Sequence, residues 1–153
     1  MAITGKSTEF FITQRLRKQY GLKVDIQRLP DKYDTGKFED TRPADFIIGM
    51  DRDLAKHCDM SNMFYIEAKE TASMRTSINL KSTFQKGQIQ GMRRAHSLKI
   101  PYFVVIRFIS VEKTYLVPAT EFLDAIDAGK KSVPLATLEK YPWNNGALHD
   151  YHL

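Results

Sequence analysis

Residues Met63–Thr71 read Met-Phe-Tyr-Ile-Glu-Ala-Lys-Glu-Thr, an apolar run that ends in charged residues. The run predicts a short buried strand over Met63–Ala68. Because side chains two apart on a strand point the same way, Glu67 and Lys69 share one face of it. The strand therefore presents an acid and an amine side by side near its end.

A second apolar run, Ala44–Met50, precedes the first and carries Asp45 near its start. We expect the two runs to pair as a hairpin with a long loop. Mg²⁺ takes oxygen ligands and usually one or two carboxylates, which Asp45 and Glu67 can supply, with the Ala68 carbonyl as a third oxygen. Lys69 can orient and help deprotonate an attacking water or stabilise charge on a phosphate. The pattern predicts a magnesium-dependent phosphodiesterase.

The acid-x-Lys triplet is a weak signal by itself. The chain contains one, Glu67-Ala68-Lys69, and roughly 1.6 are expected by chance at this composition. The competing interpretation is an exposed ion pair between Glu67 and Lys69. The nearby Asp45 and the charge distribution along the chain favour the nuclease interpretation.

The charge of the chain is uneven. The formal net charge is +5, yet Thr71–Val111 contains no Asp or Glu. This asymmetry begins directly after the proposed site, and Lys and Arg contacts to phosphates supply most non-specific DNA affinity. The alternative is an ordinary solvated basic face. The residues that we predict to contact DNA are Arg75, Lys81, Lys86, Arg93 and Arg94.

Length and composition favour one folded nuclease domain over residues 1–153, with 42% hydrophobic residues. The single cysteine, Cys58, excludes an internal disulfide and fits a reducing compartment. No apolar run is long enough for a membrane helix or a signal peptide. We therefore expect no membrane partner and a cytoplasmic location, in a bacterial cell or a bacteriophage-infected one.

The order of expected elements is helix, three strands, helix, two strands, helix. This order predicts an α/β fold with a central mixed sheet flanked by helices. The expected elements are a helix over Ser7–Tyr20, strands over Leu22–Leu29, Ala44–Met50 and Met63–Ala68, a helix from Ser82 or Thr83 to about Ser97, strands over Pro101–Ile109 and Lys113–Pro118, and a helix over Ala119–Asp127.

An apolar strand with Asp, followed by an apolar strand with Glu-x-Lys, resembles the PD-(D/E)xK nuclease superfamily, whose core is restriction-endonuclease-like. The chain looks more specifically like the RecU-type Holliday junction resolvases over about two-thirds of its length, roughly residues 45–141. The stretches that carry this resemblance are Tyr65–Thr71, Leu80-Lys81-x-x-Phe84-x-x-x-Gln88-Ile89-x-x-Met92, Tyr102–Phe108, Thr114–Val117 and Gly129–Pro134.

The resemblance implies a homodimeric, Mg²⁺-dependent endonuclease that nicks four-way DNA junctions symmetrically in recombination and repair. Mn²⁺ can substitute in such a site, and no nucleotide cofactor is implied. By the same resemblance Asp45 and Glu67 are metal ligands, Lys69 is the catalytic lysine, and Gln88 is a helix glutamine near the metal. Glu9 matches an acidic position that related resolvases place near the site.

The sequence also departs from the family pattern. Pro43 stands where the family has a threonine, so an outer ligand is missing or replaced. The segment Asp31–Arg42, where the family builds a stalk that enters the junction, is shortened. The alternatives are therefore a nuclease for flap, single-stranded or duplex DNA, or a catalytically inactive DNA-binding relative.

Overall fold

The computed structural model describes residues 6–29 and 42–143. Most of the segment Asp31–Arg42, where the family builds its stalk, lies outside the described residues. Within the described part of the chain, no helix has the length and apolar character that crossing a membrane requires.

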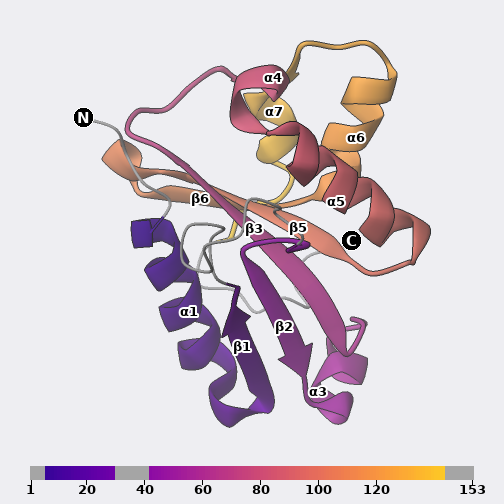
Figure 1. Cartoon of the computed structure of the whole chain (residues 1–153). Coiled ribbons are helices and arrows are strands. Elements are labelled where there is room, and N and C mark those ends of the chain that lie inside the picture. Colours follow the sequence, from indigo (N-terminus) through magenta and orange to yellow (C-terminus); the bar gives the residue numbers. More distant parts are fainter. Residues whose placement is uncertain (1–5, 30–41, 144–153) are drawn as a thin grey trace, which may run out of the picture.

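A five-stranded mixed sheet forms the centre of the molecule (Figure 1), in the order β1-β2-β3-β5-β6. Strands β2 and β3 pair antiparallel, β3 and β5 pair parallel, and β5 and β6 pair antiparallel. This confirms the predicted α/β fold with a central mixed sheet. The strands are β1 (Val24–Arg28), β2 (Phe46–Met50), β3 (Met63–Thr71), β5 (Tyr102–Phe108) and β6 (Lys113–Pro118).

Helices cover both faces of the sheet. Figure 1 shows α1 against one part of the sheet and α4, α5 and α6 grouped beyond β5 and β6. A second, two-stranded sheet pairs β4 with β7 beside this group. These elements are α1 (Lys6–Tyr20), α3 (Arg52–His57), β4 (Ser77–Asn79), α4 (Leu80–Thr83), α5 (Lys86–Ser97), α6 (Ala119–Asp127), β7 (Ser132–Pro134) and α7 (Leu135–Leu138), with short 3₁₀ turns at Gly21–Lys23 and Ile109–Val111.

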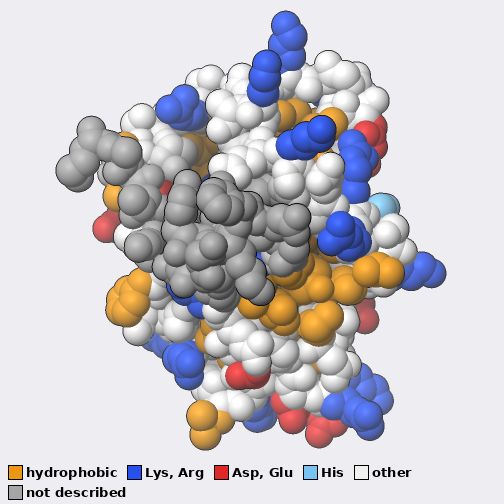
Figure 2. Space-filling view, viewed as in Figure 1, with side chains coloured by type: hydrophobic (Ala, Val, Ile, Leu, Met, Phe, Trp, Pro, Cys, Tyr) orange, Lys and Arg blue, Asp and Glu red, His pale blue; other side chains and the backbone are white. Residues whose placement is uncertain are grey.

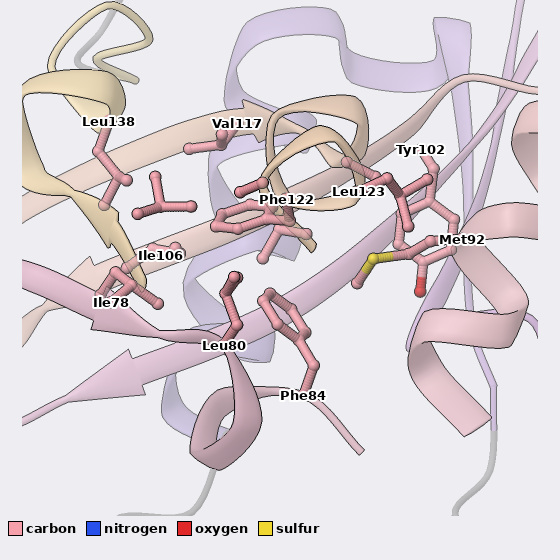
Figure 3. Close-up of a cluster of buried hydrophobic side chains, with 14 of the residues drawn as sticks. Ile78, Leu80, Phe84, Met92, Tyr102, Ile106, Val117, Phe122, Leu123 and Leu138 are labelled. Atoms are coloured by element: carbon pink, nitrogen blue, oxygen red, sulfur yellow. The ribbon is translucent and has the colours of Figure 1, made fainter. Parts of the chain in front are cut away.

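The central strands contribute to two separate cores because their side chains alternate between the faces. On β5, Val104 and Ile106 belong to the core beneath α5 and α6, whereas Phe103 and Val105 belong to the core beneath α1. Figure 3 shows the first core, in which Phe84 and Phe122 lie close together, with ring centroids 5.0 Å apart. Burial on both faces explains why this strand is almost continuously apolar in sequence.

Three of the differences from the sequence prediction have a clear physical cause. Strand β3 continues through Thr71, rather than ending at Ala68, because its last residues pair in register with the end of β5. The polar connection after β2 contains α3, whose first turn is capped by the Asp51 carboxylate. The helix expected from Ser82 is two helices, α4 and α5, because Phe84 between them has extended backbone and is buried.

Candidate active site

Strand pairing brings the two predicted carboxylates together. Phe46, the first residue of β2, pairs with Ile66 of β3, so Asp45 lies across from Glu67. The Asp45 Oδ2 atom accepts a hydrogen bond of 2.8 Å from the backbone N–H of Ala68. Both acids are buried, Asp45 with 6% and Glu67 with 3% of its surface exposed. Two buried acids side by side, one just before β2 and one on β3, can serve as metal ligands, since buried charge needs a partner.

Gln88 of α5 connects Glu67 to Lys69. Its Nε2 donates to Glu67 Oε1 at 2.7 Å, and its Oε1 accepts from Lys69 Nζ at 3.0 Å. The same Oε1 accepts from the backbone N–H of Gln85, which fixes the amide at the start of the helix. Lys69 Nζ also lies 3.8 Å from Glu67 Oε1. The predicted glutamine therefore holds the acid and the amine in one network.

Burial changes the protonation of both charged groups in this network. Desolvation and the charge of Asp45 raise the pKa of Glu67 to about 8 from its ordinary 4.5. Desolvation also lowers the pKa of the Lys69 amine below its ordinary 10.5, although Glu67 and Asp45 oppose this. Both shifts reduce the charge at the site, because burial disfavours the ionised forms. A cation at the site would favour the ionised carboxylate of Glu67.

Two residues of the site have no counterpart in the sequence prediction. The Tyr102 hydroxyl lies 3.4 Å from Glu67 Oε2 and donates to the Pro43 carbonyl at 3.1 Å. Arg42 lies 3.3 Å from Asp45 Oδ1. In sequence, Tyr102 belongs to an apolar run that is typical of a buried strand. In the structure, its pairing with Tyr65 across β3 and β5 brings it near the site.

Glu9 lies on α1, with its carboxylate 2.7 Å from Arg28 of β1. The acid that joins α1 to the central strand is instead Glu70. Its carboxylate accepts from the Ser7 hydroxyl and from the backbone N–H of Thr8. A carboxylate at a helix N-terminus stabilises the helix, so Glu70 anchors α1 to β3.

The donor set fits a hard divalent cation. Within residues 6–29 and 42–143, no three side chains of His, Cys, Asp or Glu gather as a metal site. Mg²⁺ does not need such a cluster, because it commonly takes one or two carboxylates and completes its shell with waters and substrate oxygens. Asp45 and Glu67 meet this requirement, with the backbone of Ala68 beside Asp45.

A polar pocket of about 380 Å³ opens beside the amine of Lys69. Its lining combines two cations and one acid with hydroxyl, amide and apolar side chains: Lys69, Glu70, Thr71, Arg75, Ile78, Asn79, Ser82, Thr83 and Ile106. Arg75 is exposed on the connection between β3 and β4. The predicted phosphate-contacting arginine therefore shares a pocket with the predicted catalytic lysine.

The other predicted DNA-contacting residues, Lys81, Lys86, Arg93 and Arg94, are all exposed on α4 and α5. Lys81, Lys86 and Arg93 line a groove of about 1260 Å³ that also includes Lys130 and Lys131. Figure 2 shows blue side chains gathered over the part of the molecule where α4 and α5 lie in Figure 1. Arg93 forms an ion pair of 2.7 Å with Asp127, so part of its charge is compensated. We name these five lining cations the basic groove.

The family model for Recombination protein U (RecU) matches residues 58–148, more than half of the chain. The chain is also similar to Holliday junction resolvase RecU from Streptococcus pneumoniae (strain Hungary19A-6), 38% identical over 84 residues, which are 52% of this chain and 41% of that protein. RecU of Streptococcus agalactiae serotype Ia is 37% identical over 81 residues, 50% of this chain and 40% of that protein.

The chain spans about two fifths of the length of these curated relatives. A partial structural similarity links it to Hjc, a Holliday junction resolvase of Archaeoglobus fulgidus, with a TM-score of 0.49 and 12% identity over 85% of this chain and 89% of that chain. The match to the family model covers β3, α5, β5, β6 and α6, and with them Glu67, Lys69 and Gln88. The chain belongs to the Recombination protein U family.

Proposed function

We propose that the protein is a divalent-metal-dependent DNA endonuclease that resolves four-way junctions. The observation that carries this proposal is the buried network in which Asp45 faces Glu67 while Gln88 joins Glu67 to Lys69. An inactive relative has no need to keep an acid pair and an amine buried together at a cost in desolvation. The names of its relatives, Holliday junction resolvases, support the choice of substrate.

Each residue of the network has a separate task. Asp45 and Glu67 would hold Mg²⁺ or Mn²⁺, with the Ala68 carbonyl as a further oxygen ligand. When bound, the metal neutralises charge on the phosphate and lowers the pKa of a water. Burial lowers the pKa of Lys69, which favours its exchanging a proton with the attacking water. Gln88 keeps the Lys69 amine directed toward this position.

DNA would approach over α4 and α5. Arg75, which lines the pocket beside Lys69, would contact a phosphate next to the scissile one. Beyond it, Lys81, Lys86, Arg93 and Arg94 would contact an arm of the junction, and Lys130 and Lys131 extend the same basic groove. Such contacts position DNA without reading its sequence.

Symmetric nicking requires two active sites, so we propose that the protein acts as a homodimer, with residues 1–153 forming one nuclease domain in each subunit. Glu9 remains proposed as an outer ligand. It would have to exchange its ion pair with Arg28 for a contact at the metal. Mass measurement in solution at micromolar concentration tests the dimer, and a monomer would contradict paired nicking.

The decisive experiment compares synthetic four-way junctions, flaps, single strands and linear duplex, with and without Mg²⁺. The variant Glu67→Ala removes a proposed ligand, and Glu139→Ala is the matched control, because Glu139 is an exposed glutamate at the end of α7. We expect paired, metal-dependent nicks on junctions only, absent in Glu67→Ala and retained in the control. Equal cutting of linear duplex would contradict junction selectivity, and binding without cutting would identify an inactive relative.

A further inference from the structure

One backbone carbonyl, that of Pro43, receives contacts from two sides near the acid pair. Tyr102 of β5 donates its hydroxyl proton to this oxygen at 3.1 Å. On the other side Gly91 of α5 lies so close that a Cβ built there would be 2.9 Å from the same oxygen. Real Cβ atoms essentially never approach an atom that closely, so any side chain at position 91 would force the backbone to move. The short segment Arg42–Asp45 is therefore held between a strand and a helix.

The same two elements also hold Glu67. The Tyr102 hydroxyl lies 3.4 Å from Glu67 Oε2, and Gln88, one helical turn before Gly91, donates to Glu67 Oε1. Tyr102 is only 5% exposed, and its ring packs edge-on against Tyr65 with centroids 5.9 Å apart, which fixes where its hydroxyl lies. Strand β5 and helix α5 thus each contact both acid-bearing segments, Arg42–Asp45 and the middle of β3.

We propose that Tyr102 and Gly91 are positioning residues that set the distance between Asp45 and Glu67. The catalytic consequence of this inference rests on the proposed function. The role of the two residues in holding Asp45 and Glu67 in place does not depend on it. Tyr102 has one proton to donate and two acceptors within reach, and the shorter distance is to Pro43. Its main role is accordingly to anchor the segment that carries Asp45. Gly91 allows α5 to approach the same segment without a steric barrier.

Helix α5 contains a second glycine, which provides a control for substitution of Gly91. Gly87 lies on the exposed first turn of the same helix, and a Cβ there would meet no atom within 4 Å. Gly87→Ala and Gly91→Ala therefore make the same chemical change, and both raise helix propensity. They differ in whether the new methyl group meets the Pro43 carbonyl.

The first readout is hydrogen exchange at the Ala68 amide, because that N–H donates to Asp45 Oδ2 and reports where Asp45 lies. We expect exchange at Ala68 to be about tenfold faster in Gly91→Ala and unchanged in Gly87→Ala, since a displaced acceptor exposes the amide to opening. Tyr102→Phe should also speed this exchange, and it serves as the second variant if Gly91→Ala does not fold. Equal protection of Ala68 in all three variants and the wild type would overturn the inference.

The second readout is catalysis and metal affinity. We expect kcat on a four-way junction to fall about tenfold or more in Gly91→Ala with KM unchanged, because a misplacement of about 1 Å can cost on the order of 100-fold. Calorimetric titration with Mn²⁺ alone should show weaker binding in Gly91→Ala and Tyr102→Phe than in Gly87→Ala. Loss of Ala68 protection in a protein whose wild type cuts no DNA would retain the positioning role and reject the nuclease. A lower kcat with unchanged Ala68 protection would reject the positioning role and retain the nuclease.

Discussion

The two faces of β3 differ in what they bury. One face carries Phe64, Ile66 and Ala68, all in the apolar core beneath α1. The other face carries Glu67 and Lys69, whose charged groups lie 3.8 Å apart under α5. The first face stabilises the fold by removing apolar surface from water. The second face carries charged groups whose desolvation opposes folding and is offset only in part by the hydrogen bonds of Gln88. One strand thus combines a stabilising face with the face that carries the proposed catalytic groups, which we call the active face.

Removing the amine from the active face should have the largest effect on activity. Lys69→Met keeps the length and the apolar stem of the side chain but lacks the amine that Gln88 accepts from. We expect kcat to fall by about 10²–10⁴-fold, the usual range for loss of a proton-transfer group. Melting temperature should stay the same or rise, because a desolvated cation has been removed. Single-turnover cleavage and thermal melting measure the two effects.

Truncating a side chain on the stabilising face should lower the stability of the protein and leave its kcat nearly unchanged. Ile66→Ala empties a fully buried position between β2 and β5, and we expect it to lower the free energy of unfolding by about 2–5 kcal/mol. At a temperature where the variant is folded, its kcat should stay within a few-fold of wild type. Met63→Ala, on the same strand but partly exposed, is the control for denaturant titration. If Ile66→Ala kept its stability and lost its activity, the two faces of β3 would not have these separate roles.

The pH dependence of stability measures how much the ionisation of buried Glu67 destabilises the folded protein. The folded-state pKa of Glu67 is raised to about 8, so the native protein binds this proton more tightly than the unfolded chain does. The resulting stabilisation is complete below about pH 4.5 and is lost as pH rises through about 8. We therefore expect metal-free Glu67→Gln to melt a few degrees above wild type at pH 8 and above. Added Mg²⁺ should raise the melting temperature of the wild type alone, and equal pH profiles for both proteins would refute the raised pKa.

The smallest expected effect concerns the far edge of the basic groove. Lys130→Glu with Lys131→Glu should weaken junction binding and reduce the slope of log affinity against log salt by about one to two units. Cutting at saturating DNA should persist, since neither residue contacts the network around Glu67. Arg52→Glu with Lys56→Glu, two exposed charge reversals on α3, changes the net charge by the same amount and is the control. If both changes act equally, the groove has no special part in binding.

Local patterns predicted the strands and the residue types of the site because the period-two alternation of β3 depends only on neighbours in sequence. They also located β6 and α6 at their observed bounds. Tyr102 could not be recognised in this way, because its hydroxyl meets Glu67 only through the parallel pairing of β3 with β5. The break at Phe84 was missed for a similar reason, since burial against Phe122 outweighs the helical tendency of its neighbours.

The structure also changes what the acid-free stretch means. In sequence it is a run of cations after the site. In space, Lys130 and Lys131 join Lys81 and Lys86 from about fifty residues away, because β7 pairs with β4 and returns the chain to the same groove. A charge count along the chain detects the first set of residues and cannot detect the second. Conversely, the ion pair between Arg93 and Asp127 lowers the contribution of one predicted contact.

The two sides of helix α5 contact different parts of the molecule. Lys86 and Arg93 line the groove on one side, while Gln88 and Gly91 contact the acid-bearing segments on the other. If DNA binds in the basic groove, as proposed, any shift of the helix on that side would change the distance between the two acids on the other side. DNA shape would then be sensed after binding rather than during it. Junctions and linear duplexes of equal affinity are expected to differ in how fast they are cut.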